Sequence, residues 1–373
     1  MRALVSEGPE RLALREVAIP RPGPGEVLVR IRVALTCATD FKLAKRGHPK
    51  FPFPLTLGHE FAGVVEAVGP GAPFAPAERV TSAVSGPCGR CDDCRLGREN
   101  LCATAFESPL FGAFADFLLV PERIVKNSLR RIPPGLSDEA AALVDPLASV
   151  VHALNLAKAQ NGAQVDGDVL IVGTGPIAAM MFFLLRGKVG ERGETGVGEG
   201  RRVVVAGRRP ERLAFFEEVN AEVARIVSPS RNPVAGALPP PFTFKENTAT
   251  PLRIESKRRE GARFSLILDT TGDAGVISAL PALAANRGTV LLFAGMPEGA
   301  RVSVDAFALH YREVSITGSF HYTPRDVEAA LALLAEGAIP VSSLVDERRG
   351  LSQWREAFDL VERGAAMKVA LVP

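Results

Sequence analysis

Four cysteines within fifteen residues are the first candidates for chemistry in this 373-residue chain. Two Cys-x-x-Cys steps share their middle cysteine, and a fourth cysteine follows after seven residues. Nearby glycines and a proline supply the tight turns that a metal knuckle needs. Four thiolates at this spacing suit one tetrahedral zinc ion and leave no position for a substrate. The pattern predicts a structural zinc site, with a redox pair or chance clustering as the alternatives. The four ligands are Cys88, Cys91, Cys94 and Cys102.

A second group of possible metal ligands lies outside that cluster. Cys37 is the fifth cysteine, His59 and Glu60 follow 22 and 23 positions later, and Asp145 precedes Pro146. One thiolate, one imidazole and a carboxylate leave a coordination position for water or substrate, as a catalytic zinc requires. Each residue also has a structural interpretation, as a core cysteine, a hydrogen-bonded histidine or an acid that begins a turn. Spacing alone leaves both interpretations open.

A glycine-rich turn suggests where a nucleotide binds. Gly173-Thr174-Gly175-Pro176-Ile177-Ala178 directly follows the apolar run 169–172 and opens a predicted helix over 176–185. The first glycine permits a tight turn, the second lets the backbone approach a pyrophosphate, and the third position needs a small residue. The helix N-terminus adds N–H donors and a positive dipole. We therefore expect a dinucleotide site here; the alternative is a turn that packs without a ligand.

The end of the next predicted strand bears on which nucleotide binds. An NAD enzyme usually carries an acid there, which accepts a hydrogen bond from the ribose 2′-OH. This chain has Gly207 at that position, followed by Arg208 and Arg209. A guanidinium suits a 2′-phosphate, which a carboxylate would repel. The sequence favours NADP over NAD, unless the two arginines are merely solvated at the start of a helix.

The elements that must position these residues divide the chain into three parts. Residues 1–147 contain short alternating runs, as at 27–33 and 61–68, with frequent Pro and Gly, which predicts a mostly β domain. Residues 148–320 alternate strand and helix patterns, which predicts a parallel sheet with crossover helices. Residues 321–373 form a mixed tail. The other predicted elements are helices 148–159, 211–220 and 325–336 and strands 169–172, 203–206, 266–269, 289–293 and 314–318.

Composition excludes several classes of protein. Apolar residues make up 47% and charged residues 23%, so the chain is not disordered as a whole. Lys plus Arg total 44 and Asp plus Glu total 42, and this balance argues against a nucleic-acid partner. The apolar stretch 176–185 is too short to span a membrane, and the N-terminus lacks a signal-peptide core. We expect a cytoplasmic protein in which 187–200 and 228–251 are loops.

Together the motifs carry a resemblance to a known family. Gly58-His59-Glu60-x-x-Gly63, the four-cysteine cluster, Val144-Asp145-Pro146-Leu147-Ala148 and the turn after residue 172 follow one another over nearly the whole chain. With these motifs the chain resembles the zinc-dependent medium-chain dehydrogenases/reductases, which include alcohol, polyol and threonine dehydrogenases. The resemblance implies an α/β fold, with a Rossmann doubly wound parallel sheet and a mostly β GroES-like catalytic domain. It also implies that the tail returns to the catalytic domain.

The resemblance assigns roles to residues of the open metal group. Cys37 and His59 would ligate a catalytic zinc, with Glu60 or Asp145 as the carboxylate ligand, and it does not decide between those two. Asp40 would hydrogen-bond His59 and fix its tautomer.

Proton transfer follows from the same resemblance. Thr39 would take the proton of the alcohol. The family's usual relay histidine is replaced by Lys42, so the proton would leave through Lys42, the cofactor ribose or water. Lys368 is similar to a basic residue that touches cofactor phosphates in relatives.

The implied activity is hydride transfer between a secondary alcohol, of polyol, sugar or cyclitol type, and NAD(P), with one catalytic and one structural zinc. A threonine-type amino-alcohol dehydrogenase and a catalytically silent nucleotide-binding protein are the alternatives. A zinc-free quinone reductase would need neither cysteine group. The expected partner is a small alcohol or carbonyl compound, with no nucleic acid or membrane. Family habit implies a homodimer or homotetramer formed through the sheet edge near 289–293 and 314–318.

Overall fold

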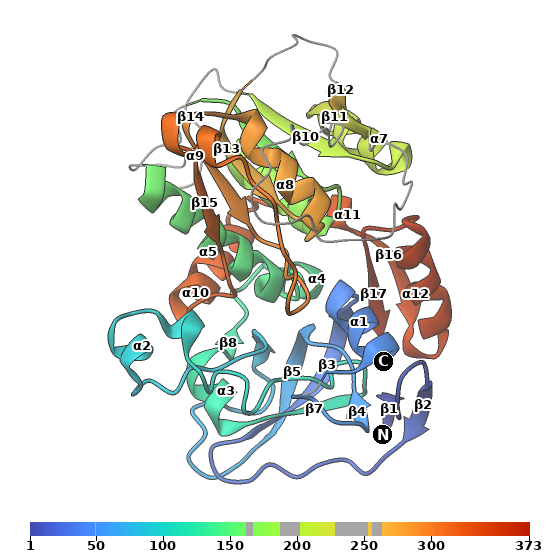
Figure 1. The fold of residues 1–373 in the computed structure, drawn as a ribbon. Helices are drawn as coiled ribbons and strands as arrows, with labels where there is room; N and C mark the ends of the chain where they lie inside the picture. The colour runs from blue at the N-terminus through green and yellow to red at the C-terminus, as the bar shows by residue number, and fades with distance from the viewer. Residues whose placement is uncertain (49, 162–166, 187–201, 228–252, 256–262) are drawn as a thin grey trace. The chain divides into compact units, whose positions relative to one another are not determined.

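The computed structural model divides into two compact units, each described here by itself (Figure 1). One consists of Met1–Asn155 with Phe320–Pro373, and the other of Leu156–Ser319. No helix within the described ranges is long and apolar enough to cross a membrane. Both inserts predicted as loops, 187–200 and 228–251, lie outside the described residues. The structure describes residues 1–48, 50–161, 167–186, 202–227, 253–255 and 263–373.

The first unit is built on two β-sheets. The larger has the order β16-β17-β3-β5-β6-β8, with β7 also paired to β3, and the smaller has the order β2-β1-β4. Neighbouring strands are antiparallel except for β16 and β17. The strands are β1 (Arg2–Ser6), β2 (Leu12–Glu16), β3 (Val27–Leu35), β4 (Leu55–Thr56), β5 (Glu60–Val68), β6 (Arg79–Thr81), β7 (Phe117–Val120), β8 (Arg130–Arg131), β16 (Val345–Gly350) and β17 (Lys368–Val372).

The alternation in the sequence explains the central strand of this sheet. In β3 the apolar residues are buried, and Arg30 and Arg32 are exposed. Successive side chains point to opposite faces of a strand. The two arginines therefore mark a short stretch of β3 in which one face of the strand is exposed to solvent, whereas the rest of the strand is buried. Leu35 and Phe61, from β3 and β5, are fully buried. The prediction of a mostly β domain is confirmed.

Two helices of the first unit begin with a side-chain cap. Thr323 caps α10, and a capping box with Asp326 satisfies donors at the helix start, where Pro324 needs none. The helices are α1 (Ala38–Arg46), α2 (Asp92–Arg95), α3 (Glu122–Asn127), α4 (Asp138–Ala141), α10 (Pro324–Ala335), α11 (Val341–Leu344) and α12 (Trp354–Arg363), with the 3-10 turns η1 (Glu99–Leu101) and η2 (Leu351–Gln353). The division between the units falls inside α5 (Val144–Asn161).

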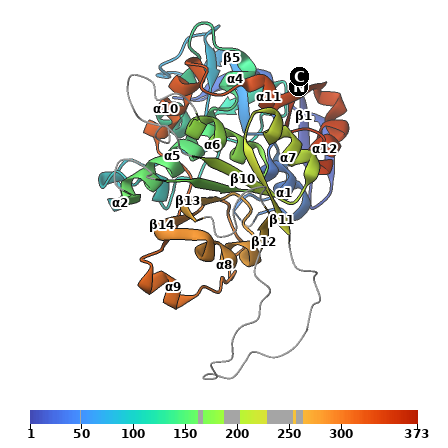
Figure 2. The same cartoon turned by 90° about the horizontal axis from the view of Figure 1, so that it is seen from above.

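The second unit is a seven-stranded sheet in the order β12-β11-β10-β9-β13-β14-β15. All neighbours are parallel except β12 with β11. Helices α6 and α7 cover one face of this sheet and α8 and α9 the other (Figure 2). The strand order reverses between β9 and β13, which is where doubly wound sheets bind ligands. The predicted doubly wound parallel sheet is confirmed.

Its element bounds are close to those predicted. The sequence did not predict β11 (Glu222–Val227), β12 (Arg253–Glu255), α8 (Ala274–Leu283) or α9 (Ala306–Tyr311). Helix α8 is largely apolar and contains Pro281, so it lacks an amphipathic pattern. The elements are β9 (Val169–Val172), α6 (Pro176–Arg186), β10 (Val203–Gly207), α7 (Pro210–Glu218), β11 (Glu222–Val227), β12 (Arg253–Glu255), β13 (Phe264–Asp269), α8 (Ala274–Leu283), β14 (Ala284–Leu292), α9 (Ala306–Tyr311) and β15 (Ser315–Gly318).

A pair of glycine substitutions tests how tightly the start of β5 is held. Gly58 has φ of +91°, and an added Cβ would lie 2.5 Å from the backbone nitrogen of Phe114. Gly71 has φ of +80° with no atom within 4 Å of the same position. We expect Gly71→Ala to cost about 1 kcal/mol through backbone strain alone, and Gly58→Ala about 2 kcal/mol more through the clash. Denaturant unfolding measures both; equal losses would contradict the packing shown at Gly58.

Candidate active site and metal centres

Strand pairing brings three possible metal ligands together in the first unit. Cys37 lies just beyond the end of β3, and His59 and Glu60 lie at the start of β5. Because Leu35 is paired with Glu60 in this antiparallel register, the end of one strand lies beside the start of the other. A sulfur, a ring nitrogen and a carboxylate oxygen of the three residues all lie within 4.8 Å of one another. The arrangement offers one thiolate, one imidazole and one carboxylate to a single cation.

Asp40 orients His59 within this group. Its Oδ1 lies 3.3 Å from His59 Nδ1 and accepts a 2.9 Å hydrogen bond from the Gly58 amide. When Nδ1 donates to the carboxylate, Nε2 keeps its lone pair for a metal. Burial on its own lowers the pKa of His59, but Asp40 and Cys37 outweigh it and raise this pKa well above its usual value. A divalent cation would offset that concentration of negative charge.

Lys368 occupies one oxygen of Glu60 and leaves the other free. Its buried Nζ donates to Glu60 Oε2 and, at 3.2 Å, to the Thr36 carbonyl. Burial raises the pKa of Glu60, and the Lys368 ammonium acts in the opposite direction. Among the described residues, nothing hydrogen-bonds the buried Glu60 Oε1. A free carboxylate oxygen beside a thiol and an imidazole fits a zinc ion.

Asp145 lies near this group without belonging to it. It is in the first turn of α5, and its Oδ1 accepts hydrogen bonds from the Tyr322 hydroxyl at 2.6 Å and the Val84 amide at 2.8 Å. Burial is the main reason that the pKa of Glu60 is raised, and the charge of Asp145 adds to it, so the two carboxylates interact. The structure therefore separates the two carboxylates that the sequence left as alternatives: one lies in the cluster and the other is held beside it.

The two residues expected to move the proton lie on α1. Thr39 and Lys42 are three positions apart, which places them on one face of the helix, and both are exposed. Cys37 immediately precedes the helix. The cysteine of the metal group therefore lies just before the helix that carries Thr39 and Lys42, whose side chains are exposed to solvent.

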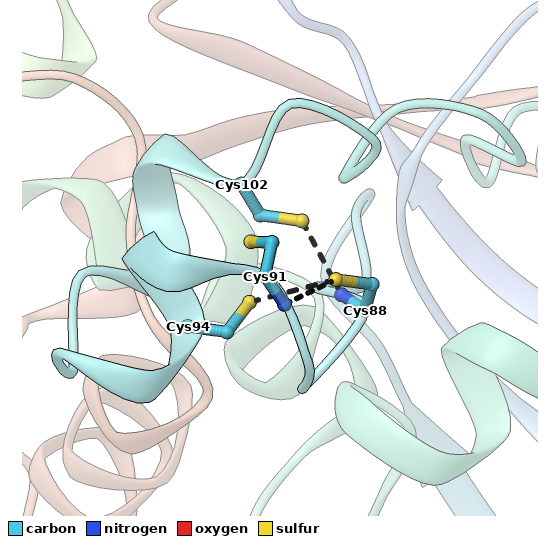
Figure 3. A group of neighbouring side chains, drawn as sticks. All are labelled: Cys88, Cys91, Cys94 and Cys102. Carbon is cyan, nitrogen blue, oxygen red and sulfur yellow. Dashed lines mark hydrogen bonds between the residues drawn. The ribbon is translucent and has the colours of Figure 1, made fainter.

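The four cysteines of the cluster lie close together within residues 88–102 (Figure 3). One ligand atom from each cysteine lies within 4.8 Å of the others, and the sulfurs of Cys88 and Cys94 are 3.9 Å apart. Gly89 and Gly97 take positive φ values of +71° and +73°, which make the turns between the cysteines. Backbone N–H groups of Arg90 and Cys91 lower the pKa of Cys88 to about 6, which favours its thiolate. Four sulfurs with no carboxylate or water-binding group among them fit a closed zinc site.

The glycine-rich turn of the second unit connects β9 to α6. Gly173 has φ of +123°, and an added Cβ would meet the Thr270 hydroxyl at 2.0 Å, so only glycine fits. A Cβ on Gly175 would meet nothing within 4 Å, which leaves space for a ligand against the backbone. Ala178 is fully buried in α6, as the small third position requires. Pro176 and Ile177 form the start of the helix.

The end of β10 lies against this turn. Gly207 is buried, and an added Cβ would lie 2.4 Å from Thr174 Cγ2. Arg208 and Arg209 follow it and are exposed, and in the described part of the chain neither guanidinium forms an ion pair.

The sequence predicted another place for Lys368 and gave no role to two other residues around the metal group. Lys368 was expected to touch cofactor phosphates, but its buried Nζ lies beside Glu60. The contacts of Tyr322 with Asp145 and of His321 with Ser85 were not predicted. One signal was present: the chain has only two tyrosines, and Tyr322 follows the last strand of the parallel sheet. The pairings themselves span hundreds of residues and leave no local pattern.

Comparison with known proteins agrees with both units. Residues 23–129 match the Alcohol dehydrogenase GroES-like domain, and residues 197–336 match the Zinc-binding dehydrogenase family. The D-altritol 5-dehydrogenase of Agrobacterium fabrum is 30% identical over 93% of this chain and 92% of its own length. The L-threonine 3-dehydrogenase of Deinococcus radiodurans is 28% identical over 100% of this chain and 97% of its own length.

A solved structure gives the same result. A zinc-binding dehydrogenase from Sinorhizobium meliloti 1021, bound to NADP, superposes with a TM-score of 0.77 at 29% identity, covering 100% of this chain and 99% of that one. The fold and the two cysteine-containing groups define a zinc-dependent oxidoreductase with a nicotinamide cofactor. The chain belongs to the zinc-dependent medium-chain dehydrogenase/reductase family.

Metal analysis of two cysteine variants separates the two sites. We expect about two zinc ions per chain in metal-replete protein. Cys37→Ser should lose the zinc of the open group and keep its melting temperature. Cys94→Ser should lose the other zinc and unfold at lower temperature, because a closed site contributes folding free energy. Elemental analysis and thermal unfolding measure these changes; a single zinc in the parent protein, or an unchanged melting temperature in Cys94→Ser, would contradict the assignment.

Proposed function

We propose that this chain oxidises a secondary alcohol of polyol, sugar or cyclitol type with NADP, and reduces the corresponding ketone in reverse. The observation that carries the proposal is the open group of Cys37, His59 and Glu60, in which three protein ligands leave room for a substrate oxygen. The similarity to the D-altritol 5-dehydrogenase over almost the whole chain supports the substrate class. A threonine-type amino-alcohol dehydrogenase is the second candidate, because relatives with that name match at 28% identity.

We assign the carboxylate ligand to Glu60 rather than to Asp145. The free Oε1 of Glu60 supports this choice, since an unpartnered buried acceptor is costly unless a cation satisfies it. Asp145 already receives two hydrogen bonds on one oxygen. Asp40 holds His59 in the tautomer that presents Nε2.

The residues of the chain then divide the chemistry among them. Zinc, when bound, supplies a positive charge that makes an alcohol hydroxyl more acidic. Thr39 accepts the hydroxyl proton and passes it toward Lys42 on the exposed face of α1, or toward the cofactor ribose or water. The turn from Gly173 to Ala178 binds the cofactor's pyrophosphate through backbone N–H groups, so the nicotinamide is held for hydride transfer.

A panel of alcohols tests this function directly. Purified protein should reduce NADP with at least one polyol, sugar alcohol or cyclitol. If the second candidate is correct, it should do so with L-threonine. The absorbance of the reduced cofactor measures the reaction. Thr39→Val should lower kcat by about 10²-fold or more because it removes the proton acceptor. Thr39→Ser keeps a hydroxyl and should recover much of that loss. Full activity in Thr39→Val would contradict the role of this residue, and no turnover with any alcohol or ketone would contradict the proposed function.

We also propose that NADP is favoured over NAD, on the basis of Arg208 and Arg209. Gly207 offers no carboxylate for a ribose 2′-OH, and the two exposed guanidinium groups suit a 2′-phosphate. The relative with bound NADP supports this choice.

Substitution of one arginine tests cofactor selectivity. Arg208→Ala should raise the KM for NADP by about 10-fold, as expected for one lost charge-assisted contact, and leave the KM for NAD nearly unchanged. Arg186→Ala, at the far end of α6, is the matched control and should change neither value. Steady-state kinetics with both cofactors decide the question; equal effects of Arg208→Ala on NADP and NAD would refute phosphate recognition.

We further propose a homodimer or homotetramer formed at the β15 edge of the second unit's sheet. Along this edge strand every residue is at least partly exposed, and nearby Phe307 and Tyr311 of α9 are 66% and 68% exposed. An edge strand with exposed aromatic neighbours can pair with a second copy. None of the five cysteines forms a disulfide, which supports a reducing location such as the cytoplasm.

A further inference from the structure

Residues 320–322, which lead into α10, contact both the metal group's neighbour Asp145 and the four-cysteine loop. Tyr322 is buried, and its hydroxyl donates to Asp145 Oδ1 at 2.6 Å while accepting from the Val84 amide at 2.8 Å. The same amide donates to Asp145 Oδ1 at 2.8 Å. One carboxylate oxygen therefore receives two hydrogen bonds, and the three groups form a closed triangle.

The residue before Tyr322 fixes the backbone on the same side. His321 has φ of +61°, in the left-handed region, and its Nε2 hydrogen-bonds the hydroxyl of Ser85. Its ring lies 3.8 Å from the ring of Tyr322. A non-glycine residue holds this backbone conformation only where its surroundings compensate the strain. The contacts of His321 with Ser85 and Tyr322 supply that compensation and leave the tyrosine little freedom.

The start of the segment is held by the loop that carries the four cysteines. The amide of Asn100, in η1 and two residues before Cys102, donates to the Phe320 carbonyl at 3.0 Å. The same amide lies 3.3 Å from His152 Nε2. His152 Nδ1 in turn lies 2.9 Å from Asp326, which completes the capping box of α10. Asn100 is 8% exposed, so these bonds are shielded from water.

We propose that Tyr322 and Asn100 are positioning residues for the open metal site. Tyr322 keeps Asp145 out of the ligand set formed by Cys37, His59 and Glu60, and Asn100 ties that tyrosine to the four-cysteine loop. The proposal rests on the proposed function in one respect, namely that the open position of the site is needed for the alcohol.

The physical reason is competition for the metal. A carboxylate beside a divalent cation binds it unless other contacts hold the carboxylate away, and a fourth protein ligand closes the position that a substrate must use. The hydrogen bond from the Tyr322 hydroxyl to Asp145 Oδ1 holds the carboxylate outside the ligand set. In Tyr322→Phe only the Val84 amide still holds Asp145, and the carboxylate can turn toward the metal.

Cobalt replacement tests the first half of this inference. Co²⁺ is exchanged into the open site while zinc stays at the four cysteines, and the d–d absorption is recorded without substrate or cofactor. Tyr322→Phe should shift the absorption, as expected when a carboxylate takes the position of a water ligand, and should slow metal loss to a chelator. Tyr311→Phe alters the only other tyrosine, 68% exposed on α9, and should match the parent. A parent-like spectrum and chelation rate in Tyr322→Phe would overturn the role of Tyr322.

A second pair of variants tests the connection to the cysteine loop and does not depend on the folding of Tyr322→Phe. Asn100→Asp keeps the side-chain shape but replaces the donor to Phe320 with a repelling carboxylate. It should shift the cobalt spectrum in the same direction as Tyr322→Phe, with less effect. Asn127→Asp is the control, because it removes a similar hydrogen bond from a side-chain amide, 2.8 Å to the Arg123 carbonyl. If Asn100→Asp behaves like Asn127→Asp, the proposed connection is wrong.

Kinetics distinguish this inference from the proposed function. In Tyr322→Phe the KM for the alcohol should rise about 10-fold with a smaller change in kcat, because the loss concerns access to the open position. An unchanged KM would overturn the inference. If the parent turns over no alcohol or ketone, the proposed function fails, but the cobalt spectra still decide whether Tyr322 restrains Asp145.

Discussion

The register between β3 and two of its neighbours, β5 and β17, is the constraint on which the candidate active site depends. β3 pairs with β5 so that Leu35 faces Glu60, and it pairs with β17 so that Leu35 faces Ala370. These two pairings set Cys37, Glu60 and Lys368 around the end of one strand. A slip of one residue in either pairing would turn a buried charged side chain to the opposite face of the sheet. The strands that form the core of the unit therefore also determine the ligand geometry.

That constraint explains how the fold tolerates charge in its interior. Asp40, Glu60 and Lys368 are all at most 3% exposed, and isolated charges at such depth would be very unfavourable. Lys368 neutralises one oxygen of Glu60, and Asp40 is engaged by the Gly58 amide and His59. Glu60 Oε1 and Asp40 Oδ2 are the two buried carboxylate oxygens left unpaired among the described residues. A bound cation would offset the charge that these two oxygens carry, which fits the assignment of a metal to this group.

Most of the fold could be predicted from the sequence, and part of the site could not. Continuous apolar runs such as Val169–Val172 give buried parallel strands directly, and the spacing of the four cysteines is local. The grouping of Cys37 with His59 needed the resemblance, because spacing alone did not separate ligands from core residues. Lys368 and Tyr322 lie 308 and 177 positions from their carboxylate partners. Contacts at that separation depend on tertiary packing, for which no motif exists.

Gly207 shows that packing and cofactor choice are not independent. An acid at this position would accept from a ribose hydroxyl, yet here even a Cβ would lie 2.4 Å from Thr174 Cγ2 in the phosphate-binding turn. The threonine between the two glycines of that turn would therefore have to move before any side chain could stand at the end of β10. A change of preference toward NAD would require a smaller residue at position 174 together with an acid at 207, since either substitution alone leaves a clash or an absent acceptor.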